Sequence, residues 1–170
     1  MTLRLFFVHL LLGLPGPQGI QPSEQVLAAC ADVCDILSRG FAASPDRSIV
    51  VVVDERTGRK GDGCSVRLLT TTTSFQTDGS PDEQLRTTLP TMGWTEDFDY
   101  AADGPDGTAF ALRRDAVLCQ VRAMWDGGDD TDPAYVPDPR YELVAGCLED
   151  PPRSTSRSPP TLAGAVRAER

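Results

Sequence analysis

The chain has 170 residues, of which 40% are apolar, and this suffices for one folded domain with a hydrophobic core. Its formal net charge is -9 at pH 7, and every cationic residue except Lys60 is an arginine. Nucleic-acid binding needs electrostatic capture of phosphates, so this charge argues against a nucleic-acid partner. It identifies no basic partner either, because acidic surfaces also serve solubility.

The N-terminus has the pattern of a secretory signal peptide. Arg4 precedes an apolar stretch from Leu5 to Leu14, which is too short to span a bilayer but fits the core of such a signal. We expect cleavage between Gly19 and Ser23, so residues 1–22 form a targeting segment. Membrane contact is then limited to this signal or to a lipid anchor. The alternative is a cytosolic protein in which the stretch is a buried strand or follows a misassigned start codon.

Two interpretations compete for the segment around Cys30. The residues LAAC at 27–30 resemble the lipobox of bacterial lipoproteins, in which the cysteine is lipidated and becomes the new N-terminus. In that family the apolar core runs almost into the box, whereas here residues 21–25 intervene. The segment also predicts a helix capped by Ser23 that ends near Arg39. We favour this helix, whose apolar face at three-and-four spacing is Val26, Leu27, Cys30, Val33, Cys34 and Leu37.

A hairpin and a second helix are predicted next. Residues 48–55 are rich in β-branched side chains and predict a central strand, residues 56–63 a glycine-rich turn, and residues 64–75 the return strand.

The second helix has the clearest start signal in the chain. Ser80 is its N-cap, Pro81 takes its first position, and Glu83 completes a capping box. Pro90 and Gly93 close it. The side chains expected to pack inward are Leu85, Leu89, Met92 and Trp94.

The second half of the domain reads as a meander. Strands are predicted at 96–102 and 108–114 around an aspartate-glycine turn, then at 115–125 and 141–147. In the third of these strands, one face carries Val117, Cys119, Val121, Ala123 and Trp125, and the other carries Gln120 and Arg122.

This element order predicts an α+β fold, with an antiparallel sheet of about five strands and two helices packed on one face. The layout resembles cystatin-like domains in element order alone. The proline-, serine- and arginine-rich tail at 151–170 is predicted to be disordered, which leaves 23–150 as a single domain.

Five cysteines bear on the cellular compartment, and their spacing shows no metal-ligand or thioredoxin-like motif. An exported chain would oxidise them. Cys119 and Cys147 lie in two strands joined by a loop, and we expect them to form a disulfide. Cys34 on the first helix is expected to reach Cys64, which leaves Cys30 unpaired. In a cytosolic chain all five would be small core side chains.

The sequence lacks most catalytic motifs. Its one histidine, His9, lies in the predicted signal, so the processed chain would have no Ser-His-Asp or Cys-His site and no histidine-ligated metal. Phosphate-binding and dinucleotide-binding glycine motifs are missing too. Paired carboxylates could still act as acid and base, but most of them fall in turns. We therefore predict a protein that is not an enzyme, and the sequence implies no cofactor.

An acidic loop follows Trp125, which we expect to lie in the core. The candidate binding residues are Asp126, Asp129, Asp130, Asp132, Tyr135 and Asp138. Calcium takes six to eight oxygens from such loops, but the EF-hand pattern fails here, with Pro137 where the terminal glutamate belongs. The favoured interpretation is a proline-stiffened connecting loop. The alternatives are a calcium site and a recognition loop that offers carboxylates to basic residues of a partner.

The resulting prediction is an exported, disulfide-bonded, non-catalytic binding or interaction domain of the cell envelope, whose partner is an unknown protein or small ligand. Alternatives are a cytosolic domain of the same fold, a calcium-binding loop protein and, last, an enzyme with paired carboxylates. The sequence indicates no oligomeric state.

Overall fold

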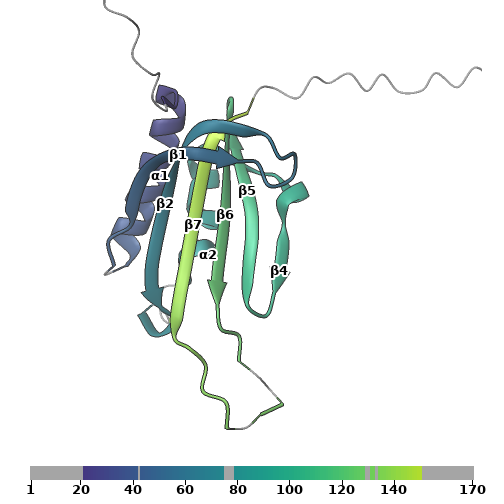
Figure 1. Ribbon diagram of the computed structural model, residues 1–170. Coiled ribbons are helices and arrows are strands. Elements are labelled where there is room, and N and C mark those ends of the chain that lie inside the picture. Colours follow the sequence, from purple (N-terminus) through teal and green to yellow (C-terminus); the bar gives the residue numbers. More distant parts are fainter. Residues whose placement is uncertain (1–20, 42, 75–78, 129–130, 133, 151–170) are drawn as a thin grey trace, which may run out of the picture.

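The computed structural model describes residues 21–150 apart from 42, 75–78, 129–130 and 133. In this part of the chain, an antiparallel sheet carries both α-helices on one face, which is the predicted α+β architecture (Figure 1). The sheet has seven strands instead of about five, in the order β1-β2-β7-β6-β5-β3 with β4 beside β5. Most of the predicted signal segment and the whole predicted tail lie outside the described residues.

Helix α1, Glu24–Gly40, begins where the sequence predicted. The side chain of Ser23 accepts a hydrogen bond from the backbone N–H of Val26, and Glu24 complements the positive helix N-terminus. The helix lies over β2 and β7. Its buried side chains are Val26, Ala29, Cys30, Val33, Ile36 and Leu37, whereas Leu27 and Cys34 of the predicted face are only partly buried.

Strands β1, Asp46–Val53, and β2, Lys60–Thr71, form the predicted hairpin, in a register that pairs Val53 with Lys60. The predicted central position of β1 is wrong, because β1 is an edge strand. Ile49, Val51 and Val53 are 43–47% exposed. A run of valines favours extended backbone wherever the strand lies, so it did not distinguish the centre of the sheet from its edge.

Helix α2, Pro81–Thr88, carries the predicted capping box, in which the backbone N–H of Ser80 donates to Glu83 Oε2 at 3.0 Å. A 3-10 turn, η2 at Leu89–Met92, extends the helix to Gly93, whose φ of 87° ends it. Leu85, Leu89 and Trp94 are buried as predicted. Met92 is 37% exposed and not packed inward, because it lies where Gly93 turns the chain back towards the sheet.

The predicted strand at 96–102 is interrupted. The structure has a short β3 at Thr95–Glu96, a 3-10 turn η3 at Phe98–Tyr100, and β4 at Ala102–Gly104. The cause is local, since the Asp97 side chain accepts a hydrogen bond from the backbone N–H of Asp99 and so caps a turn in place of a strand.

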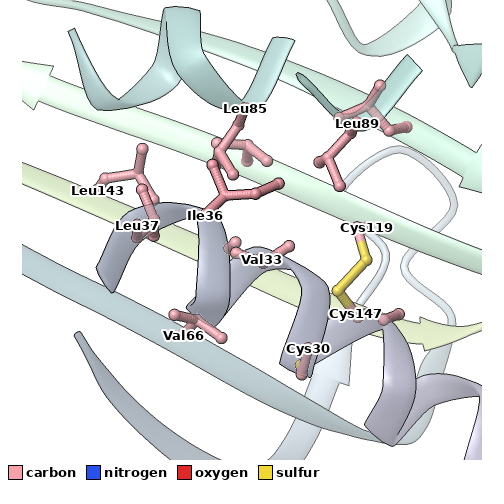
Figure 2. Packing of buried hydrophobic residues seen from close by; sticks show 14 of the residues in the cluster. Cys30, Val33, Ile36, Leu37, Val66, Leu85, Leu89, Cys119, Leu143 and Cys147 are labelled. Atoms are coloured by element: carbon pink, nitrogen blue, oxygen red, sulfur yellow. A yellow bond between two sulfur atoms is a disulfide. The ribbon is translucent and has the colours of Figure 1, made fainter. Parts of the chain in front are cut away.

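The meander consists of β5, Gly107–Arg114, β6, Val117–Trp125, and β7, Arg140–Glu149. Strand β7 then pairs with β2, which joins the two halves of the chain into one sheet. Figure 2 shows how side chains of α1 and α2 meet those of β2 and β7 between the helices and the sheet. Each fully buried leucine or valine there contributes roughly 1.5–3 kcal/mol relative to exposure.

Two disulfides link this core. Cys119 and Cys147 are direct cross-strand partners on β6 and β7, with Cα atoms 4.0 Å apart, and they form the predicted bond. Cys64 bonds to Cys30 and not to Cys34, which is free and partly buried. Four residues along a helix rotate a side chain by roughly 40°, and only Cys30 shares the fully buried stripe with Val26 and Val33.

The Cys30–Cys64 bond also bears on the lipobox. A cysteine sulfur that forms a disulfide has no valence left for a thioether to lipid, and Cys30 lies inside a continuous helix. With its sulfur in this disulfide, Cys30 is not available for lipidation in this structure, and a lipid anchor is not shown. Of the four residues at 27–30, Ala29 and Cys30 lie on the buried face of α1, Leu27 is partly buried and Ala28 is exposed.

Candidate functional site

The sheet face opposite the helices, here the outer face, is covered at one end by the chain's own hairpin. Figure 1 shows β1 and the start of β2 crossing in front of β7 and β6. We call residues 50–63 the strap. Val52, near the start of the strap, packs with Ala111, Leu118 and Leu148 in a second, smaller apolar cluster.

Two glycines allow the strap to lie this close to the sheet. A Cβ atom on Gly146 of β7 would lie 3.1 Å from Val52 Cγ1, and one on Gly63 would lie 2.6 Å from Val52 Cγ2. Both values are shorter than ordinary van der Waals contact. A larger residue at Gly63 or Gly146 would clash with Val52, so the position of the strap depends on both glycines.

Polar side chains on β6 hold the strap. The side-chain amide of Gln120 donates to the backbone C=O of Val53 at 3.2 Å and accepts from the backbone N–H of Glu55 at 2.8 Å. It satisfies the two groups that an adjacent strand would otherwise bind. Arg122 Nη2 donates to both carboxylate oxygens of Glu55 at 2.7 Å.

Asp54 organises the turn that follows. It is 2% exposed, and its carboxylate accepts hydrogen bonds from the hydroxyls of Thr57 at 2.6 Å and Tyr100 at 2.9 Å. Burial raises the pKa of Asp54, but these bonds and those from the backbone N–H groups of Arg56 and Thr57 outweigh it, so the net pKa is lowered. Burial, followed by the bond to Asp54, raises the pKa of Tyr100. The carboxylate therefore stays ionised inside the structure.

Ion pairs fix the tip of the strap to the rest of the sheet. Arg56 pairs with Asp99 of η3 at 2.5 Å, and Arg59 pairs with Asp150 beyond β7 at 3.1 Å. Asp150 also pairs with Arg113 of β5. The tip is thus anchored to elements at both ends of the meander.

A cavity of about 300 Å³ lies between the strap and the outer face. This volume is at the small end of the range for ligand pockets. Its lining is mainly apolar, from Val50, Val51, Val52, Val53, Ala109, Phe110, Val121, Met124, Val144 and Gly146. Its polar residues are Glu55, Ser65, Tyr100, Gln120 and Arg122. The arrangement can hold a small apolar molecule beside one cation and one carboxylate.

The predicted acidic loop lies away from this cavity, between β6 and β7, and its base is closed by Asp126. The Asp126 carboxylate accepts from the Tyr135 hydroxyl at 2.5 Å and from the backbone N–H groups of Asp138 at 2.8 Å and Gly128 at 2.9 Å. These bonds, the one from Tyr135 first, lower the pKa of Asp126. The loop is thus organised by its own carboxylate.

The other predicted loop residues do not form one site. Asp138 pairs with Arg140 at 2.6 Å, and backbone and side-chain hydrogen bonds from Arg140 lower the pKa of Asp138. Asp132 accepts from the backbone N–H of Ala134 at 2.9 Å. Asp129 and Asp130 lie outside the described residues. Within the described part of the chain, no group of three or more histidine, cysteine or acidic residues could hold a metal ion. A recognition role for this loop stays a prediction.

Trp125 marks the boundary between the acidic loop and the core. Its ring stacks on that of Tyr141, with ring centroids 6.0 Å apart, and it is partly buried against the core as expected.

Sequence reasoning missed the cavity and found only the two polar residues on its floor. Gln120 and Arg122 were expected to alternate with core residues of β6, and they do point to the outer face. The strap that covers them follows from contacts between residues about 65 positions apart. No local pattern carries that information.

Among the described residues, no helix is both long and apolar enough to cross a membrane. Comparisons with protein-family models, with curated proteins and with solved structures gave no match to this chain. Its function is therefore inferred from the geometry of the outer face.

Proposed function

We propose that the chain is a non-catalytic binding domain that acts outside the cytoplasm and holds a small, mostly apolar ligand in the outer-face cavity. The observation that carries this proposal is the cavity itself. Concave sites with apolar walls and a few placed polar groups are the usual form of small-molecule sites. Here the strap supplies one wall and the sheet supplies the other.

The cysteines support the proposed location outside the cytoplasm. The two disulfides are consistent with an extracytoplasmic location, since such bonds persist in oxidising environments. The signal-like pattern of residues 5–14 supports export as well. Residence in the cell envelope is part of the proposal.

Binding is favoured over catalysis by the state of the ionisable groups around the cavity. Glu55 is held by Arg122, and the hydroxyl of Tyr100 donates to the buried Asp54. Each group is already engaged by a partner in the structure. A general acid or base would instead need a pKa near the working pH and an open path to the substrate.

Fluorescence of the neutral, environment-sensitive dye prodan tests the proposal on the purified protein. We expect saturable binding with enhanced emission. Ala109→Phe fills the cavity from β5 and is expected to weaken binding about tenfold, a loss of roughly 1.4 kcal/mol of affinity. Ala134→Phe makes the same change at an exposed position in the acidic loop and serves as the matched control.

Melting curves of both variants establish that they fold. Saturable dye binding that Ala109→Phe weakens by about tenfold or more, with Ala134→Phe unchanged, supports the cavity as the site. Absence of saturable binding, or equal binding by the two folded variants, contradicts it.

A further inference from the structure

Arg122 is the one cation among the residues that line the cavity. It lies on the outer face of β6, in a row across the sheet that also contains Ala109, Val144 and Arg67. An arginine among apolar neighbours offers a flat, fixed fork of N–H donors, which matches the geometry of a carboxylate or a phosphate.

A carboxylate already occupies this arginine, and it comes from the strap. Glu55 Oε1 and Oε2 both lie 2.7 Å from Arg122 Nη2, and the backbone N–H of Glu55 is held by Gln120. The side chains of Arg122 and Glu55 are 52% and 56% exposed. Half-exposed ion pairs add little to stability, so exchanging one carboxylate for another at Arg122 carries little penalty.

We propose that Arg122 recognises the head group of the ligand, that this ligand is an apolar molecule with a single carboxylate, and that Glu55 occupies Arg122 until the ligand displaces it. The inference rests on the proposed binding function and names the class of ligand. The apolar part lies against Val52 and Met124, and the carboxylate takes the place of the Glu55 side chain.

The charge of the chain favours one negative charge on the ligand over two. A net charge of -9 penalises each further anionic group that approaches, and a single arginine offsets only one of them. The small volume favours a medium-length chain over a long lipid. Together these features indicate a monocarboxylate of the medium-chain fatty-acid type.

Displacement of bound prodan by three ligands of equal chain length tests this class. Decanoate, decanol and decylamine, each below its micelle concentration, differ only in the head group. We expect decanoate to bind a few-fold more tightly than decanol, on the scale of a half-exposed ion pair, and decylamine to bind most weakly. Preference for decylamine, or equal affinity for the three, overturns the carboxylate class of ligand. The proposed binding function would still stand in that case, provided that prodan binds in the cavity.

Two substitutions test the exchange at Arg122. Arg122→Gln is expected to lower decanoate affinity a few-fold and to leave decanol affinity unchanged. Glu55→Gln removes the competing carboxylate and is expected to raise decanoate affinity several-fold, again without effect on decanol. Because decanol reports on the apolar walls alone, a parallel change in both affinities would mean that the strap had loosened, and this would contradict the exchange.

A second arginine–glutamate pair on the same face provides the control. Arg67 Nε lies 2.7 Å from Glu142 Oε1, and neither residue lines the cavity. Arg67→Gln is expected to leave decanoate affinity at the wild-type value. If it lowers decanoate affinity as much as Arg122→Gln does, the effect is one of surface charge in general and the assignment to Arg122 fails.

Discussion

The two faces of the sheet are built in opposite ways. The inner face is sealed by α1 and α2, and its side chains, together with both disulfides, form the main core. In the described part of the chain, the outer face is covered at one end by the strap and by Tyr100 of η3, with a four-residue apolar cluster and partly exposed ion pairs. Folding free energy is therefore concentrated on one face, which leaves the other free to keep a cavity.

Removal of both disulfides is expected to have the largest effect. The bonds close sequence separations of 34 and 28 residues, and each is worth roughly 3–4 kcal/mol in the chain-entropy model. The double variant Cys30→Ser, Cys119→Ser therefore loses an amount comparable with the whole stability of a small domain, about 5–15 kcal/mol. Urea unfolding measured by circular dichroism checks this.

The free cysteine of the inner side, Cys34, gives the contrast. Cys34→Ser changes a free, partly buried thiol and is expected to alter unfolding free energy by less than about 0.5 kcal/mol. A large loss in Cys34→Ser together with a small loss in Cys30→Ser would show that Cys34 is the partner of Cys64.

Truncation of one leucine on each face is the next test. Leu143 on the inner face is fully buried, and Leu143→Ala is expected to cost about 2–5 kcal/mol of unfolding free energy. Leu69 on the outer face is 56% exposed, and Leu69→Ala is expected to cost no more than about 0.5 kcal/mol. Denaturant midpoints compare the two, and similar losses would mean that the outer face is covered in solution.

The dependence of stability on pH below about 4 is expected to come from the strap and not from the apolar core. The net pKa of Asp54 is lowered on folding, so its contribution to stability is present above the unfolded pKa of about 3.9 and is lost as pH falls through the lower folded value. Asp54→Asn is therefore expected to flatten the dependence of melting temperature on pH below about 4. Asp35→Asn, at an exposed position of α1, is the control and should keep the wild-type slope.

The smallest effect is expected in the acidic loop. Asp126→Ala removes the acceptor for the backbone N–H groups of Gly128 and Asp138, so exchange of these two amide hydrogens should accelerate while the melting temperature stays nearly constant. Millimolar calcium is expected to leave the melting temperature of the wild type unchanged, since the Asp126 carboxylate already serves the loop. A rise with calcium would restore the calcium interpretation.

Local signals identified several elements correctly. Ser23 and the Ser80–Glu83 box mark the starts of both helices, because a cap and the helix it serves are adjacent in sequence. The strands predicted at 115–125 and 141–147 correspond to β6 and β7, and the Cys119–Cys147 bond was predicted with them, since neighbours in a hairpin come from one short stretch of chain.

Other expectations failed where two distant surfaces had to meet. Cys30 and Cys34 both lie on the predicted apolar face of α1, and only the docking angle of the helix on β2 selects Cys30. Asp97 caps a 3-10 turn where a strand was predicted at 96–102. The cavity was not predicted because its walls come from β1 and from the meander, which lie far apart in the sequence.

The sequence by itself determined the helices, the hairpins and the side chains that β6 presents to each face, because period and capping act over a few residues. Only the tertiary structure decided that β1 is an edge strand and that the strap crosses the outer face. Val52 can rest on the sheet because Gly63 at the start of β2 and Gly146 on the neighbouring β7 both lack a side chain at this contact. Such a contact is a property of packing between distant segments, and it is what creates the cavity.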